Sequence, residues 1–113
     1  MEIRVDTYQK VKTVRPLGNL RFAEDGDRRL RNVFEEAAAD GTSRFTLDLR
    51  HVKYMDSNSL GQLVAALHRV HELGGDIKLF GVQKKVLDAM VLVRLNELFD
   101  IYDEEHEAVA AYV

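Results

Sequence analysis

The chain has 113 residues, a formal net charge of −3 and no cysteine. This length suits one domain with one core, so we expect a single domain over residues 1–113. A chain without cysteine excludes disulfides, a thiolate nucleophile and cysteine-based zinc sites, and it fits a reducing compartment. The weak negative charge argues against binding to the phosphate backbone of a nucleic acid.

Hydropathy predicts a compact protein with no membrane insertion. Hydrophobic residues make up 46% and charged residues 31% of the chain, a balance typical of globular domains. The longest purely apolar run, residues 89–93, is far shorter than the roughly 20 residues needed to cross a bilayer. The opening residues, MEIRV, lack the charged segment and apolar core of a secretory signal. We therefore expect a cytoplasmic location.

The N-terminal third predicts a hairpin followed by a helix. Residues 3–8 and 11–17 alternate apolar or β-prone residues with polar ones, as in two antiparallel strands. Pro16 removes a ladder donor, which is tolerated at a strand end or a bulge. Gly18 and Asn19 then turn the chain, and the acidic residues 24–27 suit a helix start. The apolar residues that follow recur at helical spacing: Leu30, Val33, Phe34, Ala37 and Ala38.

After Gly41, strands and helices alternate along the chain. Strands are predicted at residues 45–49, 77–80 and 99–102. One helix follows the segment 54–61, with apolar residues from Leu60 to Val70, and stops at Gly74 and Gly75. Another spans residues 86–94, and a short one runs from the acidic residues 103–105 toward Tyr112. This order favours parallel crossovers. The predicted fold class is α/β, with a mixed, mostly parallel sheet, an N-terminal hairpin and about four α-helices.

The segment YMDSNSLG, residues 54–61, places small polar side chains between a predicted strand and a predicted helix. Asp and Ser side chains there accept hydrogen bonds from the first helical turn, while a serine at this position is also open to modification. Ser59 and Gln62 have the spacing of a capping box, which predicts a structural role for Ser59. Ser57 has Leu60 three residues later and hence no reciprocal partner, so it is the hydroxyl more available for modification.

Searches for catalytic and metal-binding patterns identify no site. The chain has no G-x-S-x-G elbow, phosphate-binding loop or dinucleotide fingerprint. His68 and His71 are three residues apart, but no third ligand has a recognisable spacing. We expect His71 to flank the core, and His51, His68 and His106 to lie at the surface. The sequence thus predicts no catalytic residue, no metal, no cofactor, little affinity for nucleotides and no enzymatic activity.

Several segments together resemble the STAS domain of bacterial anti-sigma factor antagonists. That pattern runs D-L-x-x-V, M-D-S-[ST]-G-L-G, a helix, G-G, a strand, and L-F-x-I-Y before acidic residues. The resemblance covers nearly the whole chain, and the segment MDSxxLG is its most specific part. The matching residues are Leu47 to Leu49, Val52, Tyr54 to Ser57, Leu60, Gly61, Gly74, Gly75, Leu79, Leu98, Phe99, Ile101, Tyr102, Glu104 and Glu105, with Gly18 to Leu20 where the family tends to have G-x-L-D.

The resemblance implies a single STAS-like domain that acts as a phosphorylation switch. In that family, a partner that is both serine kinase and anti-sigma factor phosphorylates the serine after the Asp, which is Ser57 here. The unphosphorylated protein binds this partner and releases a sigma factor, whereas the phosphorylated protein does not bind. A serine phosphatase is the second implied partner, and we expect a monomer or weak dimer. The predicted partner-binding residues are Asp56, which orients the loop, and Asn58, Ser59, Gly61 and Gln62.

Three positions depart from the family pattern. Ser59 replaces the family's glycine, Asn58 replaces a small hydroxyl residue, and Arg21 stands where the family often has Asp beside the phosphorylation site. The alternative function is a STAS-type adaptor or scaffold subunit of another system, such as a transporter ATPase, a two-component output or a lipid-transport complex.

Overall fold

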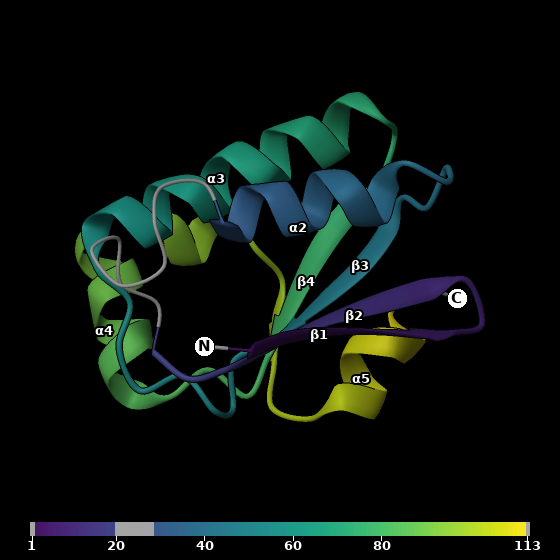
Figure 1. Cartoon of the computed structure of the whole chain (residues 1–113). Coiled ribbons are helices and arrows are strands. Elements are labelled where there is room, and N and C mark those ends of the chain that lie inside the picture. Colours follow the sequence, from purple (N-terminus) through teal and green to yellow (C-terminus); the bar gives the residue numbers. More distant parts are fainter. Residues whose placement is uncertain (1, 20–28, 113) are drawn as a thin grey trace.

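The computed structural model describes residues 2–19 and 29–112, and a five-stranded sheet forms its centre (Figure 1). The strands follow one another across the sheet in chain order. Among the described strands, only β1 and β2 pair antiparallel, and each later strand is parallel to the one before it. The predicted mixed sheet with an N-terminal hairpin is therefore confirmed. Its strands are β1 (Glu2–Tyr8), β2 (Val11–Leu17), β3 (Arg44–Asp48), β4 (Asp76–Phe80) and β5 (Ile101–Tyr102).

Four α-helices lie within the described residues, as predicted. Two of them, α2 and α3, lie side by side across one face of the sheet, while α5 covers part of the other face (Figure 1). The predicted acidic helix start at residues 24–27, and Leu20 and Arg21, lie outside the described residues. The helices are α2 (Arg29–Ala38), α3 (Ser57–Glu72), α4 (Lys84–Leu92) and α5 (Glu105–Ala110), with a short 3₁₀ helix η1 (Leu95–Glu97).

A two-residue turn sets the register of the hairpin. Gln9 and Lys10 have positive φ values of 49° and 69°, as a type I′ turn requires. The turn places Tyr8 opposite Val11, and this pair fixes the register of all the other residue pairs between β1 and β2. Pro16 lies opposite Ile3, beyond the last pair of β2 with β3, so its missing N–H interrupts no ladder between those strands.

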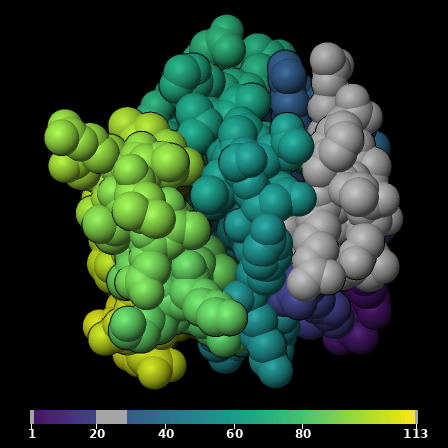
Figure 2. Space-filling model, turned by 90° about the vertical axis from the view of Figure 1, so that its left-hand side faces the viewer, coloured from purple at the N-terminus to yellow at the C-terminus, as the bar shows by residue number. Residues whose placement is uncertain are grey.

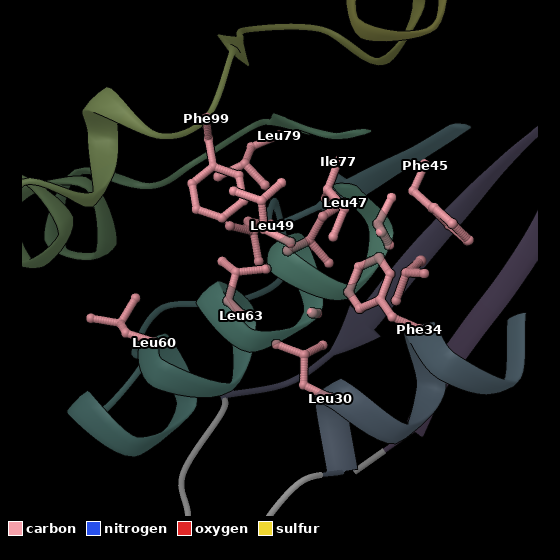
Figure 3. Packing of buried hydrophobic residues seen from close by; sticks show 14 of the residues in the cluster. Leu30, Phe34, Phe45, Leu47, Leu49, Leu60, Leu63, Ile77, Leu79 and Phe99 are labelled. Carbon is pink, nitrogen blue, oxygen red and sulfur yellow. The ribbon is translucent and has the colours of Figure 1, made fainter. Parts of the chain in front are cut away.

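The apolar core lies between the sheet and the pair α2 and α3 (Figure 3). Alternate residues of β3 and β4 face this side because successive side chains of a strand point to opposite faces. Phe34 of α2 meets Phe45 of β3 edge to face, with ring centroids 5.5 Å apart. The largest fully buried side chains of the protein include Phe34, Phe45, Leu47, Leu49, Leu63, Leu67, Ile77 and Leu79.

The opposite face of the sheet is polar and internally paired. Thr13 and Thr46 share a buried hydrogen bond of 2.7 Å between their hydroxyls. The hydroxyl of Tyr112 lies 2.6 Å and 2.7 Å from the carbonyl oxygens of Phe45 and Asp76, so it fastens the C-terminal segment to two strands. No buried side-chain nitrogen or oxygen of the described residues lacks a partner, as expected for a stable polar layer.

Two local predictions are wrong. His71 does not flank the core; its side chain is half exposed and its Nε2 lies 3.2 Å from Asp76. Phe99 is buried, but the last strand begins only at Ile101, because a 3₁₀ turn intervenes after α4. His51, His68 and His106 are exposed, as predicted.

Candidate functional site

The β3–α3 loop, residues 49–56, leads from the sheet to the start of α3. Val52 and Met55 anchor it from inside, since only 0% and 4% of their surfaces are exposed. The N–H of Lys53 donates to the side-chain oxygen of Asn19 at 2.8 Å, which ties the outer side of the loop to the end of β2. The loop that leads to Ser57, the first residue of α3, is therefore held by the core on its inner side and by Asn19 on its outer side.

Asp56 is the N-cap of α3. Its carboxylate accepts the N–H of Ser59 at 2.9 Å, and its carbonyl accepts the N–H of Leu60 at 3.0 Å. Ser57, Asn58 and Ser59 are consequently the first three helical residues. The predicted capping box of Ser59 and Gln62 is wrong, because the N-cap is Asp56, so the helix begins three residues earlier than a cap at Ser59 would place it.

Ser59 and Gln62 have other roles in the structure. Ser59 was predicted to line the contact surface. Only 4% of Ser59 is exposed, however, and it faces the interior from the first turn of α3. The side-chain oxygen of Gln62 accepts the N–H of Leu30 at 3.2 Å. That N–H belongs to the first turn of α2 and has no partner within its own helix. Gln62 thus joins the two helices that cover the core.

The remaining predicted site residues lie together at the exposed start of α3. Ser57, Asn58 and Gly61 are exposed, and Asp56 and Gln62 are partly exposed. Ser57 and Gly61 are four residues apart and share one face of the helix. A Cβ atom at Gly61 would meet no neighbouring atom within 4 Å in the part of the chain that the structure describes. Figure 2 shows this part of α3 next to α4 on one face of the molecule.

A buried ion cluster holds the base of the β3–α3 loop. Asp48, at the end of β3, has a fully buried side chain. Its carboxylate accepts hydrogen bonds from Arg15 Nη1 at 2.6 Å and from Arg50 Nη2 at 2.9 Å. Burial alone would raise the pKa of Asp48, but hydrogen bonds from Arg50 and Arg15 outweigh it and lower the pKa below its usual value. The Arg50 guanidinium also lies 5.3 Å from the ring centre of Phe80.

Two further contacts connect this cluster to neighbouring helices. Both oxygens of Glu105, at the start of α5, accept the Arg15 guanidinium at 3.1 Å. The side-chain amide of Gln83, at the start of α4, donates to the carbonyl of Arg50 at 2.8 Å. Sequence analysis did not identify this cluster; the available signal was a carboxylate at the end of an otherwise apolar strand, with an arginine two residues later.

No group of three or more potential metal-ligating side chains occurs in the part of the chain that the structure describes. In the same residues, no helix is both long and apolar enough to span a membrane.

The fold agrees with the family comparison. Residues 2–108 match the model of the STAS domain, and the chain belongs to the STAS family, in its anti-sigma factor antagonist type. Such domains are generally not enzymes. A relative from Thermotoga maritima named "Putative anti-sigma factor antagonist" is 34% identical over 77 residues, which are 68% of either chain.

Solved structures share the fold. The crystal structure of the Thermotoga maritima protein TM1081 has a TM-score of 0.81 and 24% identity, over 96% of this chain and 92% of that one. The anti-sigma factor antagonist SpoIIAA in its unphosphorylated form has a TM-score of 0.82 and 15% identity, over 98% and 96% of the two chains. Its phosphorylated form, from Bacillus, has a TM-score of 0.74. At these identities the likeness shows the fold alone.

Proposed function

We propose that this protein is a phosphorylation-switched anti-sigma factor antagonist. With Ser57 unphosphorylated, it binds a partner that is both serine kinase and anti-sigma factor, and a sigma factor is released. Phosphorylation of Ser57 abolishes this binding, and a serine phosphatase restores it. The observation that carries the proposal is an exposed serine as the first residue of α3, directly after the capping Asp56, in a family whose member SpoIIAA exists in both phosphorylation states.

Burial supports Ser57 over Ser59 as the phosphate acceptor. A kinase must bring ATP to within bonding distance of the acceptor hydroxyl, so that hydroxyl has to be reachable from solvent. Ser57 is exposed, whereas only 4% of Ser59 is. Modifying Ser59 would require the first turn of α3 to leave the core, where its neighbour Leu60 is packed.

Asn58, Gly61 and Gln62 form the proposed contact surface around Ser57. A glycine inside a helix costs about 0.5–1 kcal/mol relative to alanine. Nothing within the described chain requires one at position 61, because a Cβ there would meet no atom within 4 Å. A partner backbone that packs directly against the helix at this point supplies a reason for the glycine.

The switch follows from charge rather than from a change of fold. A phosphate adds about −1.5 to −2 charges at pH 7. The N-terminus of α3 tolerates an anion because its unpaired N–H groups and its dipole favour negative charge. The adjacent Asp56 carboxylate repels the phosphate, and a closely packed partner leaves no room for it. Binding is therefore lost by repulsion and steric exclusion while the helix stays in place.

The test is to map the phosphate after incubation with ATP and the serine kinase/anti-sigma factor from the same cell. Wild type, Ser57→Ala and Ser59→Ala are compared by mass spectrometry. We expect the phosphate on Ser57 in wild type and Ser59→Ala, and its loss in Ser57→Ala. Phosphate on Ser59, or full phosphorylation of Ser57→Ala, contradicts the assignment.

A further inference from the structure

The free edge of β1 is the feature that carries a further inference. In the described part of the chain, β1 pairs only with β2 and forms one end of the sheet. All its residues except Ile3 are exposed, and Val5 is among the large apolar side chains left open to solvent, with 42% of its surface exposed. An edge of this kind offers unpaired N–H and C=O groups to another strand.

The turn determines which backbone groups face outward. In a hairpin with a two-residue loop, the residues that flank the loop form a hydrogen-bonded pair, and such pairs alternate along the ladder. Tyr8 flanks the loop opposite Val11, so the even-numbered residues of β1 direct their N–H and C=O groups toward β2. The groups directed away from the sheet belong to Ile3, Val5 and Thr7.

We propose that a second copy of this chain pairs with β1 in antiparallel orientation about a twofold axis at Val5. Val5 then lies opposite the partner's Val5, and Ile3 lies opposite the partner's Thr7. These are the outward-facing residues, and their three pairs exchange about six backbone hydrogen bonds. The two five-stranded sheets join into one, and each exposed Val5 packs against its counterpart.

Charge complementarity selects this register. Arg4 lies opposite the partner's Asp6, twice by symmetry, at the non-hydrogen-bonded positions where side chains approach most closely. Sliding the strands by two residues in either direction places Arg4 opposite the partner's Arg4 or Asp6 opposite the partner's Asp6, and like charges directly opposite destabilise a pair. Sliding the strands by one residue places residues whose backbone N–H and C=O groups face outward opposite partner residues whose groups already face β2, so the hydrogen bonds cannot form. Charges on an edge strand normally block pairing, but the alternating signs of Glu2, Arg4 and Asp6 make this edge complementary to itself.

The contacts that Arg4 and Asp6 make within the chain leave them available. Arg4 pairs with Glu2 at 2.8 Å and Asp6 with Arg15 at 3.3 Å, and the Arg4, Glu2 and Asp6 side chains are each about 60% exposed. Exposed pairs of this kind contribute little to stability. The dimer is consequently held by backbone hydrogen bonds and two exposed ion pairs, so its formation depends on both protein concentration and salt.

Exchange of the charges tests the register. Arg4→Asp and Asp6→Arg each place like charges opposite one another in a homodimer, whereas an equal mixture of the two variants pairs every Asp with an Arg. By analytical ultracentrifugation over a wide concentration range, we expect a wild-type dimer, an affinity at least about tenfold lower for either variant alone, and recovery in the mixture. Wild type that stays monomeric, variants that dimerise like wild type, or a mixture without recovery overturns the proposal.

Amide hydrogen exchange of wild type gives a second readout that needs no variant. The amides of Ile3, Val5 and Thr7 should become protected as the protein is concentrated, while Arg4 and Asp6, already bonded to β2, should change little. Equal exchange of the outward amides in dilute and concentrated samples contradicts the pairing, whatever the variants do.

Discussion

At the scale of single residues, two serines two positions apart have opposite surroundings. Ser57 is exposed as the first residue of α3, and Ser59, two residues later in the same helical turn, is buried. The capping carboxylate of Asp56 uses the N–H of Ser59 at 2.9 Å, so the serine contributes its backbone rather than its side chain to the cap. Residues 56–59 therefore place a buried serine and an exposed serine within one helical turn.

This arrangement predicts unequal costs for removing the two side chains. Asp56→Ala removes the cap and should lower the free energy of unfolding by about 1 kcal/mol. Ser59→Ala, which leaves that cap in place, should cost less. Urea unfolding followed by circular dichroism measures both values. A larger loss of unfolding free energy for Ser59→Ala than for Asp56→Ala would indicate that Ser59, not Asp56, is the N-cap.

Gly61 predicts a substitution that stabilises the fold and weakens the function. Gly61→Ala should raise the free energy of unfolding by about 0.5–1 kcal/mol, because the new Cβ meets no neighbour and alanine favours the helix. If the partner packs against this glycine, binding of the serine kinase/anti-sigma factor should weaken in the same variant. Calorimetric titration and urea unfolding measure the two effects.

Gly75→Ala is the matched control for that substitution. A Cβ at position 75 would overlap the backbone carbonyl of Ser43, so this variant should lose stability. Undiminished partner binding by a more stable Gly61→Ala protein would remove Gly61 from the contact surface.

The sequence predicted the helix start but not which residue caps it. Two patterns overlap there, Asp56 followed by Ser59 and Ser59 followed by Gln62, and spacing alone does not rank them. Tertiary contacts decide which residue caps the helix. Leu60 packs into the core, and the side chain of Gln62 accepts the N–H of Leu30 in the first turn of α2. Ser57 is exposed, as expected, but the reason given for preferring it, a cap formed by Ser59, does not hold; Ser59 is unavailable because it is buried.

At the scale of elements, the two faces of the sheet are built differently. Alternation in β3 and β4 sends Phe45, Leu47, Ile77 and Leu79 toward α2 and α3, and this was readable from the sequence. The other face depends on pairs far apart in the chain, such as Arg15 with Glu105, which no local pattern reveals. The positions of the strands were predictable from alternation, while the order of the strands in the sheet and the ion cluster at the strand ends required the structure.

The cluster around Asp48 predicts acid sensitivity. The pKa of Asp48 is lower in the folded protein than the value of about 3.9 expected for an unfolded chain. Its contribution to stability is therefore fully present above the unfolded pKa and is lost as pH falls through the folded one. Asp48→Asn should lower the free energy of unfolding by about 2 kcal/mol at pH 7 and flatten the fall of this free energy as the pH drops below about 4.

Urea unfolding at a series of pH values measures this effect, with Asp103→Asn as the control. Asp103 is exposed, so its substitution should leave the pH dependence of wild type unchanged. An Asp48→Asn protein that loses stability on acidification as steeply as wild type would mean that other carboxylates govern the acid limit.

At the scale of the whole molecule, the proposed switch needs no rearrangement. The loop before Ser57 is anchored by Val52 and Met55 inside and by the Asp48 cluster at its base, so the start of α3 is held against the core. A charge added at Ser57 changes the surface that the partner meets, and the core beneath it stays packed.

Titration of the purified serine kinase/anti-sigma factor with wild type and with the protein phosphorylated on Ser57 tests this account most directly. We expect tight binding of the unphosphorylated protein and at least about a hundredfold weaker binding of the phosphorylated one, which corresponds to about 2.8 kcal/mol. The circular dichroism spectra of the two forms should coincide. Equal affinity of both forms for the partner would contradict the proposed switch.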